Sequence, residues 1–88
     1  MDLLIELAAA KALRKKIPGK TAKEFIKRLE AIADDPFSGH RNVETIKGVK
    51  NGFRLRIGDW RAVYHVDVES QKIVVTDVKS RGDIYKRF

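Results

Sequence analysis

The spacing of apolar residues changes at Gly52, and this change constrains the fold more than any other feature of the sequence. Before it, residues 21–35 (TAKEFIKRLEAIADD) carry apolar side chains at the i, i+3, i+4, i+7 spacing of an amphipathic helix. After it, apolar and polar residues alternate, as in strands with one buried face, near residues 53–57, 60–68 and 73–78. Helices segregated from a mainly antiparallel group of strands predict an α+β fold.

The first part of the chain adds a strand and a helix to this plan. Residues 3–7 (LLIEL) can form a short strand, and residues 8–17 (AAAKALRKKI) are strong helix formers. Pro18-Gly19 ends that helix, because proline and glycine are typical of helix ends. Thr21 and Glu24 have the spacing of a capping box, which predicts that the second helix begins there.

Turn-forming residues connect the two halves. Residues 36–51 are rich in them and are predicted to be mainly a connection, with a short element possible at residues 43–46. A polar tail, residues 79–88, follows the last strand. We therefore expect one domain over residues 1–88, in which an N-terminal strand and two helices pack on a mainly antiparallel sheet.

Composition excludes several classes of protein. Apolar residues make up 43% and charged residues 35% of the chain, which describes a globular rather than a disordered protein. No apolar run approaches the roughly 18 residues of a membrane span, and no signal peptide is recognised. The absence of cysteine excludes disulfides and thiolate metal sites and fits a reducing cytosol, so we expect a cytoplasmic protein with no membrane partner.

The net charge of +7 is large for 88 residues. Such a charge favours a polyanionic partner, which can be RNA, DNA or an acidic protein. A basic domain whose charge serves only its solubility is the simpler alternative.

The sequence from residue 52 to residue 64, GFRLRIGDWRAVY, predicts a hairpin with a two-residue loop at Gly58-Asp59. This loop places Arg56 opposite Arg61, an arrangement of like charges that costs stability unless a partner or solvent compensates. No carboxylate is expected on the arginine side of residues 53–57. The face toward the helices should carry Phe53, Leu55, Ile57, Trp60, Ala62 and Tyr64, and the other face Arg54, Arg56 and Arg61.

A solvated charged face is common on half-exposed antiparallel sheets and would explain the arginines without a function. Two observations favour a function instead. Arginine is used throughout, and its planar fork of donors matches phosphate. The tail also adds further cations and a tyrosine, namely Lys79, Arg81, Tyr85, Lys86 and Arg87.

These residues carry a resemblance to a known family. FRLRIGDWRAVYHVD followed by VKSRGDIYKRF is similar to the RelE/ParE toxins of type II toxin–antitoxin systems, and the IKG of residues 46–48 lies where the family usually has LKG. The resemblance spans nearly the whole chain, and its hairpin signature is fairly specific. It implies a microbial-RNase-like α+β fold.

For RelE-like members the resemblance implies ribosome-dependent cleavage of mRNA, in which a ribose 2′-hydroxyl attacks the adjacent phosphate. It implies no metal or cofactor. Arg61 matches the arginine that contacts the scissile phosphate, and Tyr85 matches a tyrosine near the attacking hydroxyl. Arg81 matches a basic catalytic position in the tail, a role that Lys79 can fill instead. The cations expected to bind phosphate or RNA are Arg54, Arg56, Lys86 and Arg87.

One departure from the family matters for the chemistry. Arg54 and Arg56 stand where the best-studied type has lysine, and arginine keeps its proton at biological pH. They can hold phosphate but are poor proton donors, so the general acid stays open among Lys79, Tyr85 and His65. His40, in the connecting segment, has a weaker claim.

The resemblance leaves other functions open. ParE-like members are understood to poison DNA gyrase without nuclease chemistry, and a catalytically silent antitoxin-binding or RNA-binding domain would share the fold. A simple basic domain is disfavoured by the hairpin signature. The family also implies a cognate acidic antitoxin, partly disordered until it folds on the toxin in a hetero-oligomer, alongside the ribosome and mRNA.

Overall fold

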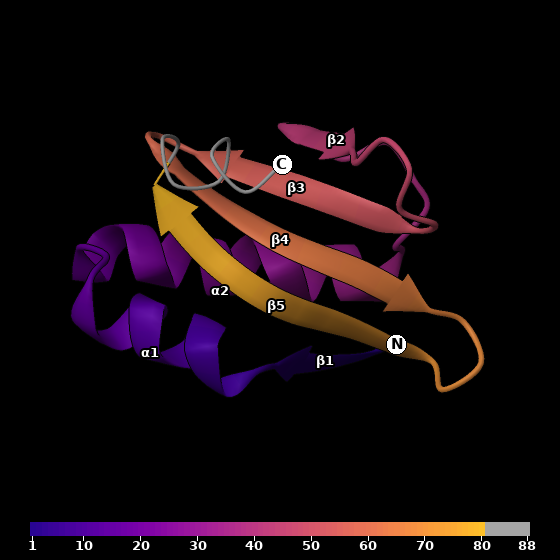
Figure 1. Ribbon diagram of the computed structural model, residues 1–88, viewed down its shortest axis with the longest axis horizontal. Coiled ribbons are helices and arrows are strands. Elements are labelled where there is room, and N and C mark those ends of the chain that lie inside the picture. Colours follow the sequence, from indigo (N-terminus) through magenta and orange to yellow (C-terminus); the bar gives the residue numbers. More distant parts are fainter. Residues whose placement is uncertain (81–88) are drawn as a thin grey trace.

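Two helices cover one face of a five-stranded sheet in the computed structural model, which describes residues 1–80 (Figure 1). The predicted α+β class is therefore confirmed, with helices on a single side. The elements are β1 (Asp2–Ile5), α1 (Leu7–Lys15), α2 (Gly19–Asp34), β2 (Val43–Thr45), β3 (Gly52–Ile57), β4 (Trp60–Asp67) and β5 (Lys72–Ser80).

The strands lie in the order β1-β5-β4-β3-β2. Strands β2 to β5 pair antiparallel with their neighbours, as predicted, whereas β1 pairs parallel with β5. The short element expected at residues 43–46 is β2, and it forms the edge of the sheet beside β3. Residues 2–5 and 72–75, which are far apart in the sequence, thus lie side by side in β1 and β5.

The start of α2 differs from the prediction. The helix begins at Gly19 and not at Thr21, and no side chain caps it. Pro18 is the N-cap, and its carbonyl oxygen accepts a hydrogen bond from the Ala22 amide at 2.9 Å. Proline is well suited to a helix start because its ring fixes φ and its missing N–H would be unpaired there anyway. The capping-box spacing of Thr21 and Glu24 is therefore not used.

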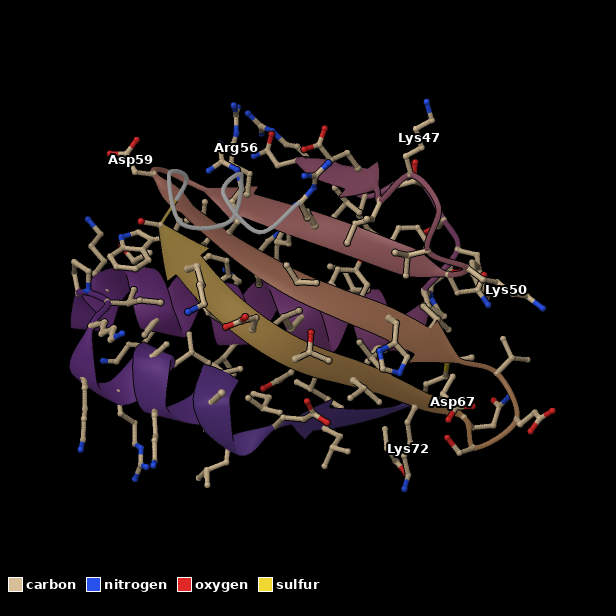
Figure 2. The ribbon with its side chains drawn as sticks, viewed as in Figure 1. Lys47, Lys50, Arg56, Asp59, Asp67 and Lys72 are labelled. Atoms are coloured by element: carbon tan, nitrogen blue, oxygen red, sulfur yellow. The ribbon has the colours of Figure 1, made fainter. Side chains whose placement is uncertain are left out.

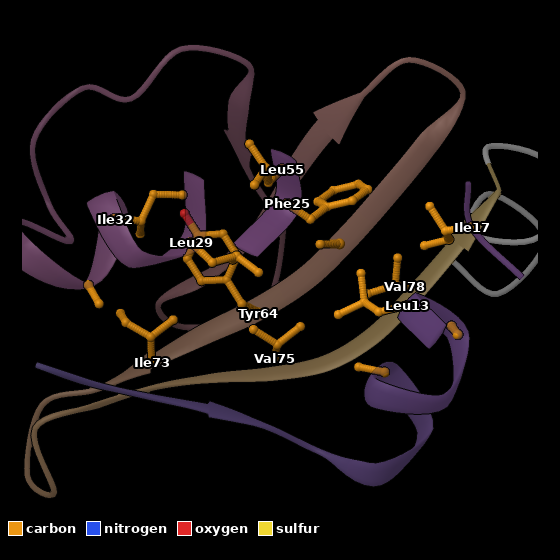
Figure 3. Close-up of a cluster of buried hydrophobic side chains, with 14 of the residues drawn as sticks. Leu13, Ile17, Phe25, Leu29, Ile32, Leu55, Tyr64, Ile73, Val75 and Val78 are labelled. Carbon is orange, nitrogen blue, oxygen red and sulfur yellow. The ribbon is translucent and has the colours of Figure 1, made fainter. Parts of the chain in front are cut away.

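The core lies between the helices and the sheet (Figure 3). Tyr64 lies beside Leu29 at its centre, and both are almost completely buried. The Tyr64 hydroxyl has no hydrogen-bond partner among residues 1–80, and burial raises the pKa of Tyr64 to about 12. The other large side chains that are fully buried among residues 1–80 are Phe25, Ile32, Leu55, Ile73, Val75 and Val78.

A register shift between β4 and β5 decides which residues share a face. The pairing changes at Val63 and Tyr64, so Thr76 is an extra residue on β5. The Thr76 hydroxyl oxygen lies 3.3 Å from the Val63 carbonyl oxygen, to which it donates a hydrogen bond. Beyond the shift, Asp77 pairs with Val63 and Lys79 pairs with Arg61. No helix among residues 1–80 is long and apolar enough to cross a membrane.

Candidate functional site

The predicted hairpin register is confirmed. Ile57 pairs with Trp60 and Arg56 with Arg61 across a turn in which Gly58 has a φ of +60°. Glycine adopts this left-handed conformation without strain, which fixes the length of the loop and hence the register. Helix α2 lies behind the strands in Figure 1, so the opposite face of the sheet is turned toward the viewer. This outer face carries Glu44, Arg54, Arg56, Arg61, Val63, His65, Asp77 and Lys79.

Arg61 points away from the core yet is only 4% exposed, which makes it the one buried charged residue among residues 1–80. Its Nη1 donates hydrogen bonds to the carbonyl oxygens of Gly58 and Trp60, each at 3.2 Å. These bonds tie the guanidinium to the hairpin turn. Its Nε has no hydrogen-bond partner within the described part of the chain. Arg61 is thus a fixed cation with donor capacity left over.

Arg54 has a counter-charge that the sequence did not reveal. Glu44 on β2 pairs directly with Arg54 on β3, and Glu44 Oε1 lies 3.6 Å from Arg54 Nε. Residues 53–57 themselves carry no carboxylate, as expected, and the counter-charge comes from the neighbouring strand β2. Arg56 is exposed at the end of β3 near the turn (Figure 2).

Strand β5 adds a lysine to the arginines of the outer face, and we call Arg54, Arg56, Arg61 and Lys79 the arginine cluster. Lys79 lies opposite Arg61, and its Nζ is 4.0 Å from Asp77 Oδ1. At the turn end of the outer face, four cations, three arginines and one lysine, stand against two carboxylates, whereas Asp2, Asp67 and Lys72 share this face at its opposite end. The surplus positive charge is concentrated where the ends of β3, β4 and β5 meet, and Arg61 lies at its centre.

The structure separates the two histidines from this cluster. His65 shares the outer face, but it lies four residues along β4 from Arg61, about 13 Å at the usual rise of a strand. His40 lies in the segment after α2, where its Nε2 is 2.6 Å from the Asp35 carbonyl oxygen and 3.2 Å from Ser38 Oγ. Those contacts give His40 a local role in the loop.

Four predicted site residues lie outside the described residues, namely Arg81, Tyr85, Lys86 and Arg87. The catalytic roles of Arg61 and Lys79 stay predictions, although the sheet brings the two residues side by side. Sequence reasoning missed Glu44 and Asp77. The signal for Asp77 was hidden by the extra residue Thr76, because strict alternation from Ile73 would place Asp77 on the core face.

No group of three or more histidine, aspartate or glutamate side chains within residues 1–80 is arranged to hold a metal ion. The site is instead a cationic surface, formed by guanidinium and ammonium groups on adjacent strands.

Comparisons with known proteins agree with this geometry. The family model described as "ParE toxin of type II toxin-antitoxin system, parDE" matches residues 6–85. No curated protein matches the chain significantly.

Solved structures show the same fold. A chain of the RelB–RelE antitoxin–toxin complex from Methanococcus jannaschii is 24% identical, with a TM-score of 0.78 over 97% of this chain and 98% of that one. The isolated E. coli RelE toxin is 20% identical, with a TM-score of 0.77 over 98% and 92% of the two chains. A YoeB/ParE toxin from Agrobacterium tumefaciens is 19% identical, with a TM-score of 0.75 over 91% and 98%.

Proposed function

The chain belongs to the ParE toxin family of type II toxin–antitoxin systems, and we propose that it is a ribosome-dependent mRNA endoribonuclease that inhibits translation. The observation that supports this activity is the convergence of Arg54, Arg56, Arg61 and Lys79 on the outer face. A row of guanidinium groups suits a phosphate backbone, since each can donate two parallel hydrogen bonds to phosphate oxygens.

In the proposed reaction, a ribose 2′-oxygen attacks the adjacent phosphorus and the bond to the 5′-oxygen breaks. The products are a 2′,3′-cyclic phosphate and a free 5′-hydroxyl. Negative charge on the phosphate oxygens grows in the transition state, and Arg61 and Lys79 are the neighbouring cations that can stabilise it. Because Arg61 is already held by two carbonyl oxygens, little reorganisation is needed when the charge develops.

Proton transfer needs other groups. Among the described residues of the outer face, Glu44 and Asp77 are carboxylates that can accept a proton, and the Lys79 ammonium can donate one. Arg54 and Arg56 hold flanking phosphates without exchanging protons. In the tail, we assign Tyr85 to the region of the attacking hydroxyl and Arg81 to the phosphate, with Lys86 and Arg87 as additional RNA contacts.

We further propose a cognate acidic antitoxin as the resting partner. Several similar structures are toxin–antitoxin complexes, including one of intact RelBE from E. coli. A net charge of +7 favours rapid association with an acidic protein. Carboxylates of such a partner would neutralise the arginines of the outer face and exclude RNA from it.

A second candidate function is inhibition of DNA gyrase without nuclease chemistry. The observation that favours it is the name of the matching family, which is that of the ParE toxin. The fold is common to both activities and does not separate them.

One experiment distinguishes the two candidates. The toxin is expressed from an inducible promoter, mRNA ends are mapped by primer extension, and plasmid supercoiling by gyrase is assayed with the purified protein. We expect new cuts within translated codons and unchanged supercoiling. Loss of supercoiling without mRNA cuts would instead establish the gyrase function and overturn the nuclease proposal.

A further inference from the structure

A second feature of the outer face lies beyond the arginine cluster. It is a pocket of about 260 Å³ at the other end of the sheet, and His65 forms part of its wall. Along β4, Val63 separates His65 from Arg61, so the pocket and the buried guanidinium lie on one continuous strand face. The pocket is lined by Ile46, Val49, Gly52, Val63, Tyr64, His65 and Thr76.

The pocket owes its shape to a tight loop between β2 and β3. The Ile46 amide donates to the Gly52 carbonyl oxygen at 2.9 Å, and the Gly52 amide donates to the Val49 carbonyl oxygen at 3.2 Å. A Cβ on residue 52 would lie 2.6 Å from Val49 Cγ1, so only glycine allows Val49 to pack this close to β3. Gly48, with a φ of +82°, supplies the left-handed residue that the loop needs.

The opposite wall is held by the register shift on β5. The Thr76 hydroxyl binds the Val63 carbonyl oxygen and is thereby fixed beside His65 and its pair residue Val74. Both walls are therefore part of the hydrogen-bonded framework of the sheet. A rigid pocket loses little conformational entropy when a ligand binds. It is therefore suited to selecting among similar ligands.

The chemistry of the walls restricts the ligand. No lysine or arginine lines the pocket, so it is not built for a phosphate group. Its surface is mainly aliphatic, with one imidazole that can stack on a ring or exchange a hydrogen bond. Two lysines of the loop, Lys47 and Lys50, are exposed and extend away from the sheet beside it (Figure 2). An apolar cavity with one polar wall and cations nearby fits a planar base on a charged backbone.

The size of the pocket also fits one base. About 260 Å³ is many times the roughly 30 Å³ that a water molecule occupies in the liquid. It is smaller than the roughly 300–1,000 Å³ of pockets that enclose whole drug-sized ligands. A single nucleobase, with its sugar and phosphate outside, is a ligand of the corresponding size.

We propose that this pocket binds one base of the RNA strand whose scissile phosphate lies at Arg61, and that His65 determines the specificity for that base. This inference rests on the proposed function, because the arginine cluster must bring the strand onto the outer face. Its lining residues Val63 and His65 lie two and four residues from Arg61 along β4, about 7 and 13 Å at the usual rise of a strand, so the selected base lies within a few nucleotides of the cut. The proposal also gives Ile46, the first residue of the IKG segment, a role in forming the pocket wall.

The test uses short RNAs that the protein binds but cannot cut. In 2′-O-methyl hexanucleotides the attacking hydroxyl is blocked, so binding is measured alone by fluorescence anisotropy. Each position in turn is made abasic or carries each of the four bases. We expect one position at which the abasic change weakens binding at least fivefold and at which the four bases differ, while other positions have small effects.

Matched valine variants then locate that position on the protein. Val49 and Val68 are exposed to similar extents, 47% and 49%, but only Val49 lines the pocket. Val49→Phe and His65→Ala are expected to remove the discrimination between bases, whereas Val68→Phe keeps it. Circular dichroism and thermal melting establish that each variant is folded. Equal affinity for all bases in the wild type, or unchanged discrimination in both folded pocket variants, overturns the proposal.

The outcome is distinguishable from failure of the proposed function. Salt-sensitive binding of the hexanucleotides that is lost in Arg54→Ala and Arg56→Ala measures the arginine cluster without reference to the pocket. If the wild type shows this salt-sensitive binding but has equal affinity for all four bases, only the pocket assignment fails. If the wild type neither binds the hexanucleotides nor cuts mRNA, both the nuclease proposal and the pocket assignment fail.

Discussion

The two faces of the sheet are built on alternate residues of the same strands, yet they bury very different side chains. On the helical face of β4, Ala62, Tyr64 and Val66 are almost completely buried among apolar neighbours. On the outer face Arg61 is nearly as buried but carries a charge, and His65 stays partly exposed. Burial of apolar surface stabilises the fold, whereas burial of a guanidinium beside other cations costs stability.

The helical face therefore serves mainly stability, and the outer face serves mainly activity. A change on the helical face should lower stability first and activity only as a consequence. A change on the outer face should alter activity while stability changes little or even rises.

Arg61→Ala should have the largest effect on activity. Removing one preorganised donor from a developing charge typically lowers the rate by about 100-fold to 1,000-fold, and we expect a loss of this order in mRNA cleavage. The measurement is the yield of cleaved ends after induction, together with growth inhibition. Arg61→Lys, which keeps the charge but loses the fork of donors, should retain only part of the activity.

The same variant tests whether the outer face is separate from the core. Arg61 makes two hydrogen bonds to backbone carbonyl oxygens, so its loss changes the local turn but leaves the apolar core untouched. We expect the circular dichroism spectrum of Arg61→Ala to match that of the wild type. Full toxicity in a folded Arg61→Ala protein would contradict the assignment of the active face.

Leu29→Ala should have the largest effect on stability. Leu29 is completely buried at the centre of the core, and such truncations typically cost about 2–5 kcal/mol of unfolding free energy. Urea denaturation measures the change. Leu7→Ala is the matched control, because Leu7 is 66% exposed and should cost less than about 0.5 kcal/mol. The remaining folded fraction of Leu29→Ala should cleave mRNA at the wild-type rate.

Alternation along a strand predicts on which face of the sheet each side chain lies. The register of the hairpin could therefore be predicted from the sequence. The pairs from Phe53 with Tyr64 to Ile57 with Trp60 follow from one two-residue loop. The outer face was harder to predict, because the carboxylates beside its arginines come from other strands. Glu44 reaches Arg54 only through the pairing of β2 with β3, and the extra residue Thr76 reverses the face expected for Asp77. Contacts between separate strands are not encoded in local periodicity.

Burial of Arg61 was likewise beyond prediction from sequence. Arginine is usually exposed, and no local pattern indicates that a guanidinium will be fixed by the carbonyl oxygens of its own turn. The parallel pairing of β1 with β5 depends on how the two helices return the chain to the sheet, which is also a tertiary property.

Tyr64→Phe should stabilise the protein, although it alters the centre of the core. The hydroxyl is buried without a hydrogen-bond partner among residues 1–80, and an unsatisfied polar group costs about 1–3 kcal/mol. We expect a gain of about 1 kcal/mol in urea denaturation, with cleavage activity unchanged. A loss of stability would mean that the hydroxyl makes a bond that the core requires.

The pH dependence of that gain has a definite sign. Burial raises the pKa of Tyr64 to about 12, above the value of roughly 10 in an unfolded chain. Between these values the unfolded state loses its proton first, so wild-type stability falls as the pH rises from 10 to 12. The difference in unfolding free energy between Tyr64→Phe and wild type should therefore grow over this range, while lysine titration cancels between the two proteins.

Glu44→Gln should have the smallest effect on stability and the most informative effect on function. Glu44 is exposed and its oxygen is 3.6 Å from the partly buried Arg54, and ion pairs with an exposed member are typically worth about 0.2–1 kcal/mol, so urea denaturation should change little. Removing the carboxylate makes the outer face more positive, and affinity for the uncleavable hexanucleotides should rise about twofold to fivefold at low salt. Glu69→Gln, in the exposed turn after β4, is the control with the same charge change.

The cleavage rate of Glu44→Gln then distinguishes a role of Glu44 in RNA affinity from a role in proton transfer. If Glu44 only offsets the charge of Arg54, cleavage should rise together with affinity. If Glu44 accepts the proton of the attacking 2′-hydroxyl, cleavage should fall even though the RNA binds more tightly, and its pH profile should lose its acidic limb. Either result assigns a role to the Glu44 carboxylate. Arg54 keeps its proton at biological pH, so proton transfer at this position depends on a neighbouring group such as Glu44. Unchanged affinity and unchanged cleavage would show that the outer face near β2 does not contact RNA.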